Sequence, residues 1–198
     1  MLKALLLDLD GVVLLPRDKY FSTRLVEDGH AVKIDKVNRF FHDEYPLCII
    51  GRLDLETAVA PYLNDWGWTG SVEQLLHYWF TYEDKLTPGI LDLARQLQAD
   101  KVSTHLASDH SLYRYRLIWD GLKLKDSFAG AFFSCLLGVT KDKPQFFTKV
   151  IEQLKLSPEQ ILFVDDDQKK LDVASHLGLQ THLFKDVDTL RDLLAEEV

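Results

Sequence analysis

The stretch LLLDLDGVV, residues 5–13, decides the fold of this chain. An apolar run of strand length leads straight into two carboxylates, Asp8 and Asp10. In an extended chain a spacing of two places both side chains on the same side. Two acids held so close repel each other unless a cation or a shared proton is present. Gly11 then permits a sharp exit from the strand. The stretch predicts a strand that ends in an acidic site, with a polar loop after a strand as the alternative.

Short apolar runs recur along the chain, and helical patterns separate most of them. Apolar runs of this length predict buried strands of a parallel sheet that helices cover on both faces. Helical stripes of apolar residues occupy 91–97, 146–154 and 171–177. We therefore predict an α/β fold. Its expected strands are Ala4–Leu7, Val102–Ala107, Ala131–Cys135, Ile161–Val164 and Thr181–Phe184.

Residues 16–86 break this alternation, because they carry helical patterns and no clear strand. Ser71–Gln74 is typical of a capping box and precedes an apolar helical face. We predict a core formed by residues 1–15 and 87–198, with a helical insertion over residues 16–86. Three of the four tryptophans lie in the insertion. We interpret them as the core of this small domain and not as ligand-stacking groups.

Composition narrows the class of protein. The chain has 198 residues and a formal net charge of −8, which argues against broad binding to a nucleic-acid backbone. Cys48 and Cys135 lack the spacing of a zinc site, and a structural disulfide is not expected, so a reducing cytoplasm fits. The apolar N-terminal stretch contains two aspartates and no small-residue cleavage site follows it. We therefore expect neither a signal peptide nor a membrane span.

A second group of acids, Asp165, Asp166 and Asp167, follows the predicted strand Ile161–Val164. Adjacent carboxylates disfavour their own full ionisation unless a cation is present. Magnesium binds through few carboxylates and takes phosphate oxygens of a substrate as further ligands. Asp167 also suits the start of a helix. The alternative is a solvated acidic turn that caps the next helix.

Two further segments place phosphate-binding groups near strand ends. Ser108 ends a predicted strand and, with the backbone N–H groups that follow, can hold a phosphoryl oxygen, although a helix N-cap fits equally. Lys141 and Lys143 precede a helix, and one cation in an acidic pocket would offset negative charge during phosphoryl transfer. Surface lysines are the ordinary alternative. His110 has no partner by spacing, so we expect it to be exposed or structural.

The order Asp-x-Asp, Ser, Lys, Asp-Asp resembles the motifs of the haloacid dehalogenase-like hydrolase superfamily. The resemblance is to the branch with a helical cap inserted after the first motif. Residues 8–13 are similar to its first motif, Ser108 to the second, residues 138–147 to the third and residues 163–166 to the fourth. Two positions depart from the pattern: Asp142 follows Lys141 where proline is usual, and Asp109 follows Ser108 where asparagine is usual. Downstream Pro144 and Phe147 set a register that selects Lys141, with Lys143 as the alternative.

The resemblance implies a doubly wound, Rossmann-like parallel sheet and a phosphatase that acts on a small phosphorylated metabolite. By resemblance Asp8 is the nucleophile that forms a phospho-aspartate, and Asp10 is the general acid and base. Lys141 stabilises the charge on Asp8 and on the transferring group. Ser108 and Asp109, through nearby backbone N–H groups, and Lys141 bind the substrate phosphate.

The resemblance also implies a Mg2+ cofactor. Its expected ligands are the Asp8 carboxylate, the Asp10 backbone carbonyl and Asp166. Asp165 is expected to act through a metal-bound water or to orient Lys141. Which of Asp165 and Asp166 binds the metal directly stays open.

Other functions remain as alternatives. A 2-haloacid dehalogenase needs no leaving-group protonation, and those relatives lack the second aspartate of the first motif, which is Asp10 here. A phosphomutase and a non-catalytic binding module that keeps the fold are the others. Arg52, in the insertion, would meet a second anionic group of the substrate or pair with a neighbouring acid. No nucleic-acid or membrane partner is expected, and the choice between monomer and homodimer is open.

Overall fold

Five parallel strands form one sheet in this computed structural model, which describes residues 1–15, 18–82 and 84–197. The strand order β3-β2-β1-β4-β5 puts the first strand at the centre. The chain adds strands on one side of β1 and then crosses to the other side, as a doubly wound sheet does. The predicted fold class is therefore confirmed. The strands are β1 (Ala4–Leu7), β2 (Ser103–Ser108), β3 (Gly130–Phe133), β4 (Ile161–Asp165) and β5 (Gln180–Leu183).

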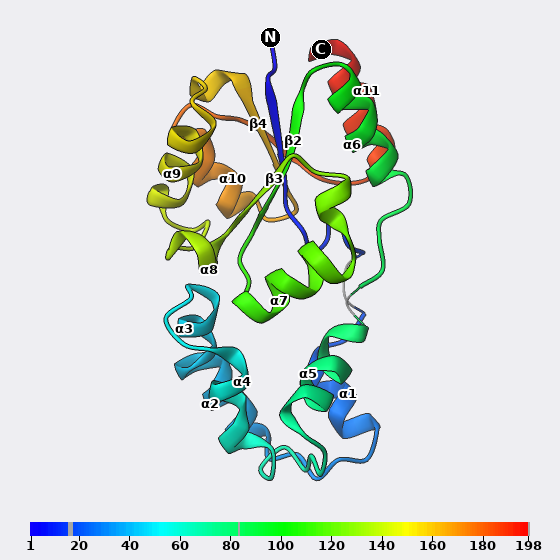
Figure 1. The fold of residues 1–198 in the computed structure, drawn as a ribbon, viewed down its shortest axis with the longest axis vertical. Helices are drawn as coiled ribbons and strands as arrows, with labels where there is room; N and C mark the ends of the chain where they lie inside the picture. The colour runs from blue at the N-terminus through cyan, green and yellow to red at the C-terminus, as the bar shows by residue number, and fades with distance from the viewer. Residues whose placement is uncertain (16–17, 83, 198) are drawn as a thin grey trace.

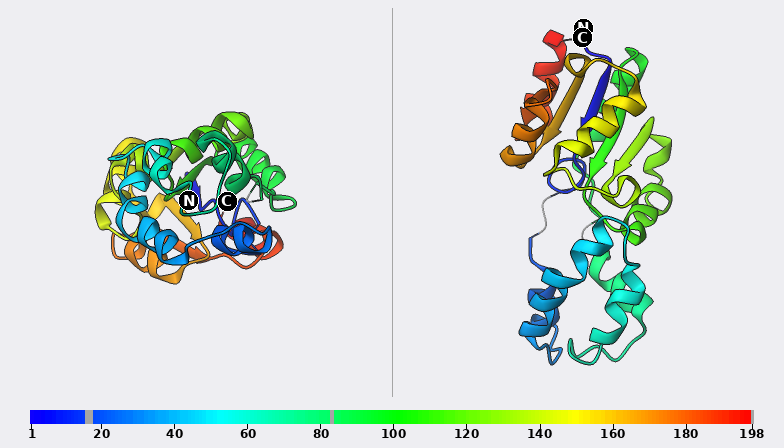
Figure 2. Two further views of the ribbon diagram at one scale, coloured as in Figure 1. Left: turned by 90° about the horizontal axis from the view of Figure 1, so that it is seen from below. Right: turned by 90° about the vertical axis from the view of Figure 1, so that its left-hand side faces the viewer.

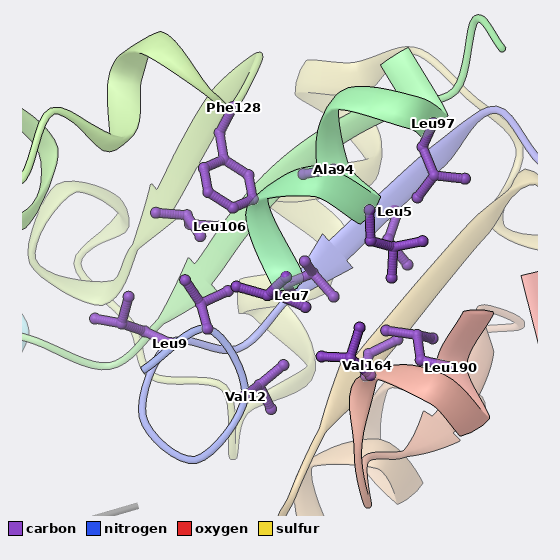
Figure 3. Close-up of a cluster of buried hydrophobic side chains, with 14 of the residues drawn as sticks. Leu5, Leu7, Leu9, Val12, Ala94, Leu97, Leu106, Phe128, Val164 and Leu190 are labelled. Carbon is purple, nitrogen blue, oxygen red and sulfur yellow. The ribbon is translucent and has the colours of Figure 1, made fainter. Parts of the chain in front are cut away.

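Strand β1 is buried on both faces, which explains its continuous apolar sequence. Leu5 and Leu7 pack into one apolar cluster, and Ala4 and Leu6 pack into another on the opposite face. Figure 3 shows the first cluster, in which Leu5 and Leu7 lie among side chains from neighbouring strands and helices. The period of two along the strand thus divides the core of the sheet into two layers.

Helices cover both faces of the sheet (Figure 1). Helices α6 and α11 contribute to the cluster that contains Leu5, and helices α9 and α10 contribute to the cluster that contains Leu6. Short turns η2 (Leu117–Gly121), η3 (Leu124–Asp126) and η4 (Pro158–Gln160) connect elements of the core. The core helices are α6 (Ile90–Ala99), α7 (Leu112–Arg116), α8 (Ser134–Leu137), α9 (Pro144–Leu154), α10 (Gln168–Ser175) and α11 (Val187–Glu197).

Strand β3 ends earlier than predicted. The expected strand Ala131–Cys135 stops at Phe133, and helix α8 begins at Ser134. The side chain of Ser134 donates a hydrogen bond to the backbone carbonyl of Ile49, with an Oγ–O distance of 2.5 Å. This contact holds the start of α8 against the helical insertion. An apolar run alone cannot reveal it, because apolar residues are common to both buried strands and buried helices.

The insertion is helical, and we call helices α1–α5 the cap. Its own apolar cluster contains Phe40, Trp66 and Trp79, each almost fully buried. The interpretation of these tryptophans as core residues is thus supported, with Trp68 half-buried beside them. Ser71 and Gln74 form the predicted capping box at the start of α5. The cap consists of α1 (Phe21–Glu27), α2 (Ile34–Asp43), α3 (Tyr45–Ile49), α4 (Leu55–Val59), the short turn η1 (Ala60–Tyr62) and α5 (Val72–Thr81).

Two linkers join the cap to the core, and they lie side by side. Leu14 bridges Leu86 in antiparallel fashion, and the N–H of Thr87 donates to the carbonyl of Val13 at 2.9 Å. The predicted start of the insertion at Pro16 lies outside the described residues. Figure 1 and the right-hand view of Figure 2 show the cap beyond the carboxyl ends of the strands. This is the edge where α/β sheets bind ligands. Among the described helices, none has the length and apolar character needed to cross a membrane.

Candidate active site

A tight loop after β1 positions Asp8 and Asp10. The N–H of Asp8 donates to the carbonyl of Val164 at 2.9 Å, which ties it to strand β4. The N–H of Gly11 donates to Leu14 at 2.8 Å and closes the loop. The loop's apolar side chains, Leu9 and Val12 among them, point into the core beside Leu7 (Figure 3). Buried anchors on both sides therefore hold the two carboxylates at the sheet edge.

Lys141 is fully buried and lies between two carboxylates. Its Nζ is 2.5 Å from Oδ1 of Asp8 and 2.7 Å from Oδ2 of Asp165. Lys143 instead pairs with Asp142 at 2.9 Å, and its side chain is 61% exposed. Of the two lysines that the sequence offered, the structure brings Lys141 to Asp8.

The electrostatics of this site follow from burial and from one shared cation. Burial raises the pKa of Asp8 and of Asp165, and the nearby Lys141 ammonium works against that rise. Burial disfavours the charged form of Lys141, but the carboxylates of Asp8 and Asp165 outweigh it and hold the lysine pKa above its ordinary value. Lys141 therefore stays charged. One ammonium does not compensate all the acids around it, and a further cation would stabilise them.

The structure places Asp8, Asp165 and Asp166 so that one carboxylate oxygen from each lies within 4.8 Å of the others. We call these three residues the acidic cluster. Asp165 already accepts from Lys141 and, through Oδ1, from the N–H of Asp167 at 2.8 Å. Asp166 is more exposed, and burial together with Asp165 raises its pKa. These hard oxygen donors fit a divalent cation such as Mg2+.

Gly11 makes room for the acidic cluster. Its backbone adopts φ +82°, and a Cβ at this position would lie 2.2 Å from Oδ2 of Asp166. Only glycine combines the left-handed conformation with so close an approach. Gly11, which the sequence predicts to allow a sharp turn after the strand, thus also leaves steric room for the Asp166 carboxylate.

Ser108 and Asp109 follow one another at the end of β2. Ser108 is buried and faces the same cavity as Asp8. Oδ1 of Asp109 accepts from the backbone N–H of Lys141 at 3.0 Å, and its Oδ2 lies 4.0 Å from Nζ of Lys170. The Asp109 carboxylate is therefore occupied in holding the loop that carries Lys141. A contribution of Asp109 to phosphate binding would come from its backbone N–H.

His110 is buried, at 6% exposure, so of the two expected alternatives, exposed or structural, the exposed one does not apply. Its Nε2 lies 3.3 Å from Oδ2 of Asp10, across the cavity edge. Sequence spacing offered no partner for it, because Asp10 is 100 residues away along the chain. His110 therefore contacts the carboxylate that the family pattern assigns to acid–base chemistry.

A cavity of about 710 Å3 lies between the core and the cap. Its core side is lined by Asp8, Asp10, Ser108, His110 and Asp166. Lys170, in the first turn of α10, lines it as well. Lys170 belongs to none of the motifs in the sequence. Its position four residues after Asp166, one helical turn beyond the acids, is the feature that could have pointed to it.

The order of these groups along the sheet edge matches one known family. A family model described as haloacid dehalogenase-like hydrolase matches residues 2–178. The chain belongs to the haloacid dehalogenase-like hydrolase family. The match includes β1 to β4 and all the site residues described above, and it ends before β5.

Curated relatives cover only parts of this hydrolase. Flavin mononucleotide hydrolase 1 of Arabidopsis thaliana is 29% identical over 108 residues, which are 54% of this chain and 44% of that protein. Bifunctional epoxide hydrolase 2 of Sus scrofa is 38% identical over 61 residues, which are 30% of this chain and 11% of that protein. The chain thus spans less than half of either relative.

Solved structures resemble the chain over nearly its whole length. A haloacid dehalogenase (HAD) family enzyme from Bacteroides thetaiotaomicron has a TM-score of 0.83 at 19% identity, and the similarity covers 98% of each chain. A complex of that enzyme with magnesium and inorganic phosphate has a TM-score of 0.78 at 20% identity, covering 94% of this chain and 96% of that one. At these identities the likeness supports the fold alone.

Proposed function

We propose that this hydrolase is a Mg2+-dependent phosphatase that cleaves a small phosphomonoester through a phospho-aspartate on Asp8. One observation carries the proposal. The carboxyl ends of β1, β2 and β4, together with the loop before α9 that carries Lys141, bring a buried carboxylate–lysine pair, a serine and the acidic cluster to the core side of the cavity. This is the set of groups that phosphoryl transfer requires, because its demands are positioning and charge stabilisation.

In the first step a carboxylate oxygen of Asp8 attacks phosphorus and the bond to the leaving oxygen breaks. Asp10 gives its proton to that oxygen, so a neutral alcohol departs. Lys141, held 2.5 Å from Asp8, offsets negative charge on the nucleophile and on the transferring group. Ser108 is positioned to bind a phosphoryl oxygen from the end of β2.

In the second step the Asp10 carboxylate accepts a proton from water, and that water attacks the phosphorus of the aspartyl-phosphate. The bond from phosphorus to Asp8 breaks, which releases inorganic phosphate, restores the Asp8 carboxylate and leaves Asp10 protonated for the next cycle. Asp10 can serve both steps because its side chain is partly exposed to the cavity, at 29%. Nε2 of His110 lies 3.3 Å from Oδ2 of Asp10 and holds this carboxylate on the core side of the cavity.

Mg2+ held by Asp8 and Asp166 would neutralise excess carboxylate charge and polarise a phosphoryl oxygen of the substrate. The fit of the residues supports this cofactor: the acidic cluster offers hard oxygen donors, and Gly11 leaves space beside Asp166. Asp165 holds Lys141 and is proposed to orient it.

The comparisons favour a phosphate monoester as substrate. The Arabidopsis relative is named for hydrolysis of flavin mononucleotide, which is a phosphate monoester. The Bacteroides enzyme with a similar fold was crystallised with magnesium and inorganic phosphate. The presence of Asp10 favours phosphatase over dehalogenase chemistry, since a halide leaving group needs no proton. A small phosphorylated metabolite is the proposed partner.

Hydrolysis of para-nitrophenyl phosphate tests this function. We expect release of nitrophenol with Mg2+, loss of release with EDTA, and loss of release in Asp8→Asn. Asp142→Asn is the control, because that acid is exposed and pairs with Lys143 away from Asp8. Full activity in Asp8→Asn, or activity indifferent to EDTA, would overturn the proposal.

A further inference from the structure

The cavity has two walls of contrasting chemistry. The core wall carries the carboxylates, Ser108 and Lys170 that the proposed phosphatase reaction uses. The cap wall carries apolar, aromatic and neutral polar side chains. Among the described residues that line the cavity, none contributed by the cap is charged. The cap residues on this wall are Tyr20, Phe21, Ser22, Val37, Asn38, Phe41, Tyr45 and Trp79.

Three rings form the centre of the cap wall, and we call Phe41, Tyr45 and Trp79 the aromatic wall. The ring centroids of Phe41 and Tyr45 are 5.2 Å apart, and those of Phe41 and Trp79 are 5.3 Å apart. Tyr45 and Trp79 are 5.6 Å apart. Helices α2, α3 and α5 each supply one ring, so the surface exists only when the cap is folded.

Partial exposure separates Phe41 and Tyr45 from the rest of the cap's aromatic core, to which the buried Trp79 also belongs. Phe40 and Trp66 are fully buried and do not line the cavity. Phe41 and Tyr45 are only half-buried, and both line it. Rings that served packing alone would be expected to lie inside with Phe40. Partial exposure toward a cavity leaves ring surface available to a ligand.

Among the described residues of this wall, none offers a charged partner to a second anionic group on the substrate. Arg52, which the sequence suggested for that purpose, is exposed and is absent from the cavity lining. Its neighbour Gly51 lies against α8, where a Cβ on Gly51 would be 2.3 Å from the backbone oxygen of Cys135. The loop therefore serves the cap–core contact. An uncharged leaving group fits the cap wall better than a carboxylate or a second phosphate.

We propose that the aromatic wall binds a flat, uncharged aromatic or heteroaromatic leaving group, so the enzyme prefers phosphomonoesters that carry such a ring system. The inference rests on the proposed phosphatase function and names its substrate class. The cavity volume of about 710 Å3 suits a ring system joined to a phosphate by a short chain. Asn38 and Ser22 supply neutral donors and acceptors for ring heteroatoms.

A set of esters with similar primary alcohols as leaving groups tests the proposal: naphthylethyl phosphate, ethyl phosphate and phosphoglycolate. We expect kcat/KM for naphthylethyl phosphate to exceed both others at least ten-fold. Phe41→Leu should lower kcat/KM for naphthylethyl phosphate by about ten-fold, mainly through KM, because loss of one stacking ring weakens binding roughly five- to hundred-fold. In the same variant kcat/KM for ethyl phosphate should change less than two-fold.

Tyr62→Leu is the matched control, since Tyr62 is another half-buried cap ring that does not line the cavity. It should leave the preference intact. Equal kcat/KM for the three esters, or an equal loss for all of them in Phe41→Leu, would overturn the substrate class while leaving the phosphatase function in place.

Binding separates this proposal from the hydrolysis on which it rests. Calorimetry on Asp8→Asn with naphthylethyl phosphonate and ethyl phosphonate should show at least ten-fold tighter binding of the aromatic compound. That result supports the aromatic wall even if no ester is hydrolysed, an outcome that would remove the phosphatase proposal alone. Equal affinities would overturn the aromatic wall as a binding surface.

Discussion

Lys141 illustrates how one buried residue serves both stability and the proposed chemistry. It contacts Asp8 and Asp165, and none of the three side chains is more than 6% exposed. Removing one partner of a buried ion pair leaves the other charge uncompensated, which costs more than the pair itself contributes. Lys143 faces solvent two residues away, so the two lysines form a natural comparison.

We expect Lys141→Met to lower the free energy of unfolding by about 3 kcal/mol and to reduce phosphatase activity at least a hundred-fold. Lys143→Met should change neither beyond experimental error, because Lys143 is exposed and pairs with the exposed Asp142. Urea unfolding and para-nitrophenyl phosphate hydrolysis measure the two quantities. A larger effect from Lys143→Met would show that the other lysine serves the site.

Gly11 permits a prediction about the metal. In Gly11→Ala the new methyl group would overlap the Asp166 carboxylate, 2.2 Å away, and displace it. We expect the Mg2+ concentration for half-maximal activity to rise at least ten-fold, as happens when metal ligands lose their orientation. Gly29→Ala is the control, since Gly29 has the same φ of +82° and its Cβ would meet nothing within 4 Å. An unchanged Mg2+ requirement in Gly11→Ala would argue against Asp166 as a ligand.

At the scale of elements, contacts made by α8 and α7 add to the linkers in holding the cap against the core. Ser134 at the start of α8 donates to the carbonyl of Ile49 at the end of α3. Gly51 then passes close to the backbone of Cys135 in the same helix. On the other side Nη1 of Arg114, from α7, lies 2.5 Å from Oδ1 of Asp84, next to the second linker. These contacts join the cap, which carries the aromatic wall, to the core, which carries Asp8.

Gly51→Ala should loosen this contact. A Cβ would meet the Cys135 oxygen at 2.3 Å, and the backbone atom cannot rotate away as a side chain can. We expect a several-fold rise in KM with little change in kcat, because the cap would close less well while the residues around Asp8 stay in place. Gly29→Ala again controls for strain at positive φ, here inside the cap. Identical KM values in the two variants would contradict a role of this contact in closure.

At the scale of the whole molecule, three apolar clusters support the structure: two on the faces of the sheet and one in the cap. His105 lies in β2 with its ring against Phe132, which belongs to one of the sheet clusters. Neither ring nitrogen has a hydrogen-bond partner among the described residues. Burial lowers the pKa of His105 from 6.5 to about 4, so the folded protein keeps it neutral.

This histidine predicts acid sensitivity of global stability. Between pH 6.5 and 4 the unfolded chain binds a proton at His105 that the folded protein does not. The stabilisation is therefore complete above pH 6.5 and is lost as the pH falls toward 4, by about 3 kcal/mol in all. His105→Leu should reduce the fall in unfolding free energy between about pH 7.5 and pH 4.5 by about 2.5 kcal/mol. Equal pH dependence in the variant and the wild type would refute this.

Much of the fold could be predicted because the relevant information is local. The buried strands of a parallel sheet are continuous apolar runs, so β1, β2 and β4 could be found from short windows of sequence. The polar residues that follow them could be assigned to one edge, since the carboxyl ends of parallel strands meet there. Strand β3 was predicted too long because an apolar run does not distinguish its last residues from the first turn of α8.

The sequence by itself thus determined the fold class, the helical insertion and the residues that reach the sheet edge. Only the tertiary structure decided the strand order, the contacts of Lys141 with both Asp8 and Asp165, and the contact of His110 with Asp10. The aromatic wall and Lys170 also became visible only there. Periodicity along a chain tells which face of an element a residue occupies, but the partner it meets there comes from distant segments whose packing no local pattern records.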